Sequence, residues 1–353
     1  MKKTPRIRIH LDKIAANGRL VLEQAAARGV RLTGVVKGAA GDLTIAACLI
    51  AAGLTEIGDS RLENLKRFRF GPQIRRVLLR LPSPSRIAAT VRFSDCSLNS
   101  EVATLEMLNA TGRAGGCAHE VMLMVDMGDL REGFAADRID HLGSVCRGLG
   151  NLRITGLGVN FSCFAGAVPT VPKLERLTEL ARILKDEYQL PIQAVSGGNS
   201  SSLPLLFDGA LPPGINHLRI GEGILLGRET LSGEILPGLD GGAFEAVAEV
   251  IQAQHKPAVS QGPTGRDAFG RIPCIPNAPA GMRYLLNIGH QDTPLSGLTS
   301  LDPELIVLGG SSDYLVAAGP AKYRVGDELS FRPDYWSLLA LMTSRYVAKE
   351  YLS

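Results

Sequence analysis

The stretch VRLTGVVKGAAGDL, residues 30–43, decides the fold class of this sequence. An apolar run rich in β-branched residues ends in a lysine, glycines follow at once, and a helical pattern begins after Asp42. A short apolar run that is bounded by turn residues and followed by a helical pattern is typical of a βα unit. We therefore expect a strand that ends near Val36 and presents Lys37 at its carboxyl end.

The same βα rhythm continues from residue 12 to about residue 225. Eight strands are expected, at residues 30–36, 56–59, 74–81, 91–93, 119–125, 153–158, 192–195 and 216–220. Residues 13–28 and 171–190 carry apolar side chains at helical spacing, and Ser60 with Glu63 matches a capping box at a helix start. Because eight parallel strands close a barrel, the pattern predicts a TIM-type (β/α)8 barrel.

The pattern changes after Gly227. A connector rich in glycine and proline leads into alternating runs at residues 244–254, 284–288, 305–308 and 328–331, which indicate antiparallel strands. Residues 335–352 combine helical and extended features, and the extended start at residues 6–10 can pair with this sheet. We predict a barrel at residues 11–230 and a smaller, mainly antiparallel β domain made of residues 1–10 plus 235–353.

Composition limits the classes of function. The chain has 353 residues, 45% of them hydrophobic, and a formal charge of only +3, which argues against a disordered, nucleic-acid-binding or membrane protein. Six cysteines without a C-x-x-C pair suit a reducing cytoplasm, where we expect the protein to be. Six histidines without ligand spacing make a bound metal an unexpected feature.

Residues able to carry chemistry are expected at the carboxyl ends of the barrel strands. Lys37 stands there, either as a Schiff-base former or as a surface lysine. The loop SGGNSS brings Asn199 and Ser200 to the end of another strand, and HLRIGEGILLG places Arg219 before Gly221. Unblocked backbone N–H groups and hydroxyls suit a phosphate. Together with Lys37, these loops indicate a cofactor that carries a phosphate.

The chain resembles the fold-type III pyridoxal phosphate enzymes of the alanine racemase type, and most closely their ornithine racemase branch. The motifs that carry the resemblance are RIRIHLDKIAANGRLV, VVKG, VDMGDLREGF, ITGLGVNFSCFAG, SGGNSS, HLRIGEGILLG and VGDELSF. The segments GDSRLENL, NFSCFAG, GRDAFG and GGSSDY are similar to the ornithine racemase branch in particular. The resemblance spans nearly the whole chain, with its motifs in the family's order.

The resemblance implies a role for each matching residue. Lys37 would form the internal aldimine with pyridoxal 5'-phosphate, and Arg219 would face the pyridine nitrogen. The phosphate would be held by Ser200 and by the backbone of Gly221 and Glu222. The remaining positions are Arg131 near the phenolic oxygen or the substrate carboxylate, Asn160 where alanine racemases have a histidine beneath the ring, and Arg345 or Tyr346 at the phosphate.

The second acid–base group departs from the family pattern. Alanine racemases use a tyrosine from the partner subunit, and SQGPTGRDAFGRIP contains none. Asp267 is the first candidate, either as that base or as the partner of a substrate ammonium. Cys163 is the second candidate, against the alternative of a core cysteine, and His290 and Asp313 are expected to line the entrance on the substrate side.

The resemblance therefore implies an isomerase, a racemase that interconverts L- and D-amino acids, with a basic substrate such as ornithine or lysine. It also implies a homodimer with a composite active site. One alternative is a non-catalytic carrier of pyridoxal phosphate, but such carriers lack the C-terminal β domain. Another is an aldolase or dehydratase acting on D-amino acids with a metal, a site that the spacing of His255, Cys274 and His290 does not suggest.

Overall fold

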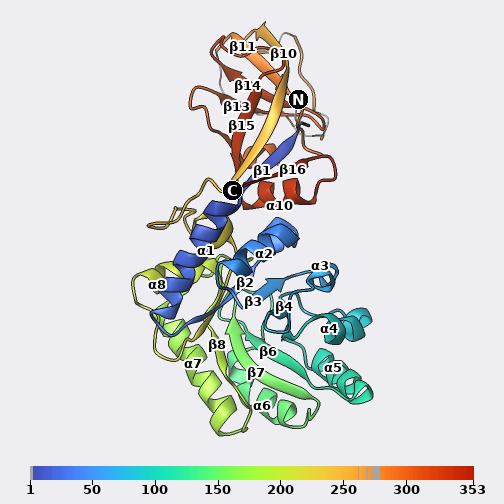
Figure 1. Ribbon diagram of the computed structural model, residues 1–353, viewed down its shortest axis with the longest axis vertical. Coiled ribbons are helices and arrows are strands. Elements are labelled where there is room, and N and C mark those ends of the chain that lie inside the picture. The colour runs from blue at the N-terminus through green and yellow to red at the C-terminus, as the bar shows by residue number, and fades with distance from the viewer. Residues whose placement is uncertain (1–2, 261, 268, 271, 273–278) are drawn as a thin grey trace. The chain divides into compact units, whose positions relative to one another are not determined.

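The computed structural model describes residues 3–260, 262–267, 269–270, 272 and 279–353, and the chain divides into two compact units (Figure 1). The barrel unit comprises Ile14–Lys37 and Gly41–Gly241. The β unit comprises Gly38–Ala40 and the described residues of Met1–Lys13 and Gly242–Ser353.

The barrel unit is a closed parallel barrel of eight strands, as predicted. Its strands are β2 (Arg31–Val35), β3 (Glu56–Asp59), β4 (Arg75–Leu78), β5 (Cys96–Asn99), β6 (His119–Val125), β7 (Leu152–Val159), β8 (Ala194–Ser196) and β9 (His217–Ile220). The barrel closes where β2 pairs with β9, in the register Arg31↔His217. All eight strands therefore point their carboxyl ends to the same mouth.

Helices follow the strands and cover the outside of the barrel (Figure 1). They are α1 (Leu11–Ala26), α2 (Leu43–Ala51), α3 (Leu62–Arg67), α4 (Ile87–Phe93), α5 (Val102–Gly115), α6 (Ile139–Arg147), α7 (Val171–Asp186), α8 (Leu203–Phe207) and α9 (Glu222–Leu226). Along the described part of the chain, no helix has the length and apolar character needed to span a bilayer.

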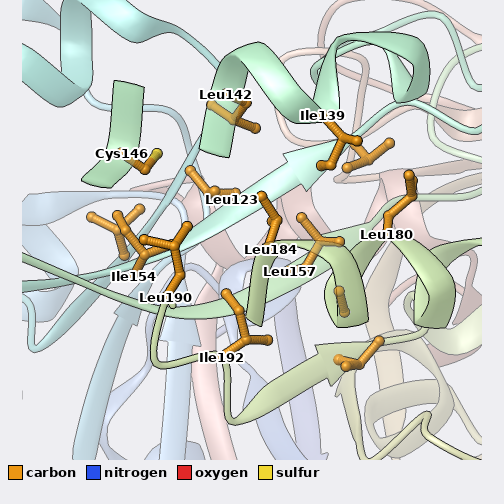
Figure 2. Close-up of a cluster of buried hydrophobic side chains, with 14 of the residues drawn as sticks. Leu123, Ile139, Leu142, Cys146, Ile154, Leu157, Leu180, Leu184, Leu190 and Ile192 are labelled. Atoms are coloured by element: carbon orange, nitrogen blue, oxygen red, sulfur yellow. The ribbon is translucent and has the colours of Figure 1, made fainter. Parts of the chain in front are cut away.

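A hydrophobic core of buried residues lies between the helices and one side of the barrel. Figure 2 shows this cluster, in which Leu123 of β6 and Leu157 of β7 pack with Leu180 and Leu184 of α7. In α7 the apolar residues recur at intervals of three and four, so one face of the helix is buried against the strands. Burying one such leucine contributes roughly 1.5–3 kcal/mol, so this cluster holds the strand ends in place.

The fourth barrel strand was predicted at the wrong place. Residues 91–93 end the helix α4, and the strand is β5, Cys96–Asn99. Every residue of β5 is buried although the sequence CSLN is half polar, because Asn99 and Ser97 bond inside the barrel. The apolar run at 91–93 packs as a helix end, which its β-branched composition does not indicate.

The capping box at Ser60 and Glu63 was also wrong. Helix α3 begins after Arg61, and no side chain caps it. The carboxylate of Asp59 accepts the N–H of Arg61 at 2.8 Å, and Glu63 pairs with Arg86 instead. The backbone N–H of the turn after β3 is thus hydrogen-bonded to Asp59, the last residue of the strand.

The β unit holds an antiparallel sheet in the order β12-β15-β10-β11-β14-β13. Its elements are β10 (Phe244–Lys256), β11 (Gly281–Leu286), β12 (Leu298–Ser300), β13 (Ile306–Gly310), β14 (Leu315–Gly319), β15 (Glu328–Pro333), α10 (Tyr335–Thr343) and β16 (Ala348–Leu352). The predicted antiparallel domain is confirmed, and residues 335–352 resolve into a helix followed by a strand.

The N-terminal strand β1 (Arg6–His10) joins this sheet, as expected. It pairs antiparallel with β10 and parallel with β16. Buried Arg6 donates to Glu328 and to Glu350, at 2.7 Å each, so both ends of the chain are tied to one ion-pair cluster. A buried arginine needs such partners, since an unpaired charge in the core is strongly destabilising.

Candidate active site

Lys37 lies at the mouth of the barrel, two residues beyond the end of β2, as the sequence predicts. Burial lowers the pKa of its amine, and the charges of Arg131 and Arg219 act in the same direction. Cys163 and Glu132 oppose that shift, so all four side chains lie within electrostatic range of Lys37. The ends of β6, β7 and β9 therefore converge on this lysine.

Arg219 is the most enclosed cation of this group, with 3% of its surface exposed. Its Nη2 donates to the carbonyl oxygen of Val159 at 2.6 Å and to Asn160 Oδ1 at 2.9 Å, and Nη1 donates to Ser196 Oγ. Among the described residues, no acceptor faces its Nε. Burial lowers the pKa of Arg219 to about 10, so it remains a cationic donor at neutral pH.

A chain of hydrogen bonds leads from Arg219 to Arg131. Asn160 donates from Nδ2 to Glu132 Oε1 at 2.5 Å, and Arg131 donates from Nε and Nη2 to the two carboxylate oxygens of Glu132. The hydrogen bonds of Arg131 and Asn160 outweigh burial, which acts in the opposite direction, and lower the pKa of Glu132. The carboxylate is thus ionised and accepts from both neighbours.

A second chain runs from Arg219 into the barrel interior. Ser196 Oγ lies 2.8 Å from His217 Nδ1, and His217 Nε2 lies 3.1 Å from Glu56 Oε1. Burial opposes ionisation of Glu56, but the hydrogen bonds of His217 and Thr33 and the charge of Arg75 outweigh it and lower its pKa to about 2. Burial also lowers the pKa of His217, which favours a neutral imidazole. A neutral imidazole that donates to Glu56 accepts from Ser196, so every donor in the chain points toward Glu56.

The two loops predicted to hold a phosphate meet in the structure. Ser200 Oγ accepts the N–H of Gly223 at 3.0 Å and of Gly221 at 3.4 Å. A Cβ at Gly221 would lie 3.1 Å from both Cβ and the carbonyl oxygen of Val35, so the loop needs glycine to approach β2. Asn199 caps the turn itself, because its Oδ1 accepts from Ser201.

Cys163 is exposed, so the alternative of a core cysteine is wrong. Its Sγ lies 3.3 Å from the carbonyl oxygen of Phe161 and receives Asn199 Nδ2 at 3.3 Å. Asp129 accepts the backbone N–H of Cys163 and fixes the loop around it. The thiol is therefore held at the barrel mouth, within electrostatic range of Lys37.

The other candidates lie in the β unit, which is considered by itself. Asp267 is exposed and accepts the N–H of Phe269 at 2.9 Å, and the Phe269 ring meets the edge of His290 with 4.9 Å between centroids. Asp313 accepts from Gln291 Nε2 at 2.9 Å. Tyr346 receives Arg345 Nη2 at 2.6 Å. Asp267 and His290 are thus joined through one phenylalanine.

The structure shows no cluster of three or more histidine, cysteine or acidic side chains placed to hold a metal, within the residues it describes. Cys274, which was considered together with His255 and His290 as a metal ligand, lies outside the described residues. The five described cysteines, Cys48, Cys96, Cys117, Cys146 and Cys163, are all free thiols.

Several residues of this site were not found from the sequence. Glu132 is the neighbour of Arg131 in the motif VDMGDLREGF, and this adjacency was the sequence signal that could have identified it. Asp59 ends β3 and is fully buried, and its Oδ2 has no hydrogen-bond partner among the described residues. Burial raises the pKa of Asp59, and the positive charge of Lys37 opposes this. Glu56 and His217 meet only through the fold.

Comparison with known proteins agrees with this geometry. Residues 9–229 match the family model described as alanine racemase, N-terminal domain. The chain is 37% identical over 353 residues to ornithine racemase of Acetoanaerobium sticklandii, with 99% of both chains covered, and 36% identical over 350 residues to lysine racemase of Thermotoga maritima, with 98% of both covered. The crystal structure of alanine racemase from Bartonella henselae with covalently bound pyridoxal phosphate superposes with a TM-score of 0.74, at 18% identity, over 99% of this chain and 100% of that one.

Proposed function

This chain belongs to the alanine racemase family, and from that premise we propose that it is a pyridoxal-phosphate-dependent racemase of a basic amino acid, ornithine or lysine. The observation that carries the proposal is identity of 37% and 36% to an ornithine racemase and a lysine racemase over nearly the full length of each. The charged and polar side chains around Lys37 suit the binding of pyridoxal phosphate and the transfer of a proton at Cα.

The residues of the barrel unit fit pyridoxal phosphate. Lys37 offers an amine whose lowered pKa favours the neutral, nucleophilic form. The hydrogen bonds of Arg219 to described residues come from Nη1 and Nη2, and its Nε would be a donor for a ring nitrogen that carries no proton. Ser200 Oγ lies with the N–H groups of Gly221 and Gly223, which donate to it, at the place where two glycine-bearing loops meet, and a phosphate bound there would take over these donors. We assign these residues to hold the cofactor.

Each of these barrel residues has its own role in the proposed reaction. When bound, pyridoxal phosphate withdraws electrons from the amino-acid nitrogen and so acidifies the Cα–H bond. Lys37 Nζ then takes or returns the Cα proton on one face. Arg131 orients the substrate carboxylate or the phenolic oxygen. Arg219 would donate to the ring nitrogen without giving up its proton, which would keep the ring a weak electron sink and favour simple proton return.

The second face of Cα needs its own acid–base group. We propose Asp267 for this role, or for binding the substrate's terminal ammonium, with Cys163 as the second candidate. Cys163 is supported by its exposure at the barrel mouth and its electrostatic link to Lys37. We place Asp267, His290 and Asp313 on the substrate side of a composite site in a homodimer, and Tyr346 at the phosphate. The free thiols support a cytoplasmic enzyme.

A panel of substrates tests the assignment. We expect kcat/KM to be about ten- to a hundredfold higher for ornithine or lysine than for alanine or serine, because one desolvated charged hydrogen bond discriminates to that degree. If Asp267 binds the terminal ammonium, Asp267→Ala should lose this selectivity and keep alanine turnover, and if Asp267 is the second base, the variant should lose turnover of both substrates. Equal or better turnover of alanine by the wild type would reject a basic substrate, and a cofactor band without any turnover would identify a carrier instead.

A further inference from the structure

We propose that Glu132 is a positioning residue that holds both arginines of the site, Arg131 directly and Arg219 through Asn160. The proposal rests on the function proposed above, because it concerns how these two cations meet the cofactor and the substrate. It adds a residue to which no role has been given so far.

The contacts of Glu132 are specific. Arg131 places both Nε and Nη2 on its carboxylate, with Nη2 at 2.5 Å from Oε1, and this fork is the preferred geometry of an arginine–carboxylate pair. The Glu132 side chain is 13% exposed against 38% for Arg131, so the carboxylate is the enclosed member of the pair. Asn160 Nδ2 adds a third donor at 2.5 Å. A carboxylate with three donors is fixed in one orientation.

Glu132 also decides which way the Asn160 amide faces. A carboxylate can only accept, so the amide must turn its NH2 group to Glu132 and its oxygen to Arg219. The observed 2.9 Å contact between Asn160 Oδ1 and Arg219 Nη2 follows from that constraint. Without Glu132, the amide can rotate and present a donor to a guanidinium that has only donors. The orientation of Arg219 therefore depends on a residue that it does not touch.

The Asn160 amide also separates the negative charge of Glu132 from the positive charge of Arg219. The groups that Arg219 contacts directly are neutral: a serine hydroxyl, a backbone carbonyl, the Asn160 amide and the Met122 sulfur. In the described chain no carboxylate pairs with Arg219. Asn160 thus lets Glu132 stabilise the cation from a distance, and the Nε of Arg219 is left available for the ring nitrogen. Glu132 therefore adjusts the electrostatic field at both arginines together.

Three substitutions test the proposal. Glu132→Gln keeps the size of the side chain and removes its charge, whereas Asn160→Leu breaks the link to Arg219 and leaves the pair with Arg131. The control is Glu120→Gln, at the other end of β6, where a partly buried glutamate pairs with Arg75 and Arg153. Each purified protein is loaded with pyridoxal phosphate, and its visible absorption is recorded between about pH 6 and pH 10. The kcat and KM for both enantiomers of ornithine are also measured.

The expected pattern separates positioning from a general loss of structure. Removing an anion disfavours the protonated form of the bound cofactor, so the pH at which its protonated and unprotonated absorption bands are equally populated should fall in Glu132→Gln. The same substitution should reduce kcat about tenfold or more. Asn160→Leu should lower kcat and increase transamination, with the band equilibrium near that of the wild type. Glu120→Gln should match the wild type in every readout.

A Glu132→Gln protein whose bands and kcat match those of Glu120→Gln would overturn the proposal. If Glu132→Gln fails to fold, wild-type values of kcat and product partition in Asn160→Leu would overturn it equally. The absorption readout does not need turnover. A wild type that binds the cofactor but racemises no basic amino acid would therefore refute the proposed function alone, while the band shift still tests Glu132.

Discussion

His217 and Glu56 form a hydrogen bond inside the barrel, with 3.1 Å between Nε2 and Oε1, although they lie 161 positions apart in the chain. The contact joins β3 to β9 across β2, whose Thr33 donates to the same carboxylate oxygen. It also ends the chain of donors that begins at Arg219. The barrel interior and the candidate site are therefore one connected polar network.

This contact predicts a defined acid dependence of stability. The pKa of Glu56 is lowered from 4.5 to about 2, which corresponds to about 3 kcal/mol of stability. A lowered carboxylate pKa stabilises the fold above pH 4.5, and the contribution is lost as the pH falls through about 2. Glu56→Gln should therefore lower the free energy of unfolding at neutral pH by up to about 3 kcal/mol. The free energy of unfolding of this variant should also change less with pH between about pH 4.5 and pH 2 than that of the wild type.

Urea unfolding of the two proteins at a series of pH values measures this effect. The matched control is Glu63→Gln, which removes an exposed pair with Arg86 and should change stability by about 1 kcal/mol or less. Equal losses in the two variants would contradict the role given to the buried contact.

The fold was predicted well where the sequence pattern is local. Residues 119–125 were placed correctly because most of the run is apolar and turn residues bound it, and the short strand at residues 56–59 was also placed correctly. The strand Cys96–Asn99 was missed because its buried Ser97 bonds to His119 of the next strand, a partner that no local pattern reveals. The apolar run at 91–93 looked like a strand and instead ends a helix.

Lys37 should carry the cofactor. Lys37→Ala is expected to lose the visible band of the bound cofactor and to retain no label after borohydride treatment, because the variant lacks the amine that follows β2. Lys66→Ala, which removes an exposed lysine of α3, should keep both. Mass spectrometry of peptides after reduction locates the label, and a label retained in Lys37→Ala would refute the assignment.

Arg219 should keep the ring nitrogen unprotonated. Arg219→Glu would place an acid against it, and a protonated pyridine draws electrons more strongly. We expect slower racemisation and a larger share of transamination, whereas Arg219→Lys should keep a cationic donor and a product ratio near that of the wild type. The measurement is the ratio of D-amino acid to keto acid formed from one L-substrate. An unchanged ratio in Arg219→Glu would disprove this role.

The proposed composite site in a homodimer predicts complementation between subunits. Mixed dimers of Lys37→Ala and Asp267→Asn chains contain one site with both groups intact, so random mixing should restore about one quarter of the wild-type activity. Each variant alone should be nearly inactive if Asp267 is the second base. An active monomer in analytical sedimentation would contradict the shared site.

The candidate site was only partly predictable from the sequence. The positions of Lys37, Ser200 and Arg219 at or just after the ends of strands were predicted because each stands beside glycines that follow an apolar run. Glu132 and Glu56 were missed because their importance comes from partners that the fold supplies, at separations of 28 and 161 residues. Glu56, at a strand start, carries no local sign of its partner, whereas the neighbour Arg131 was a local sign for Glu132.

Incubation of the purified protein with L-ornithine and pyridoxal phosphate in deuterated water tests the central claim most directly. A racemase exchanges the Cα proton during inversion, so the account predicts D-ornithine with deuterium at Cα and a final mixture with equal amounts of both enantiomers. Chiral chromatography with mass spectrometry measures both quantities. Ornithine that remains entirely L, or that is converted to an aldehyde, an amine or a keto acid in place of its enantiomer, would contradict the account.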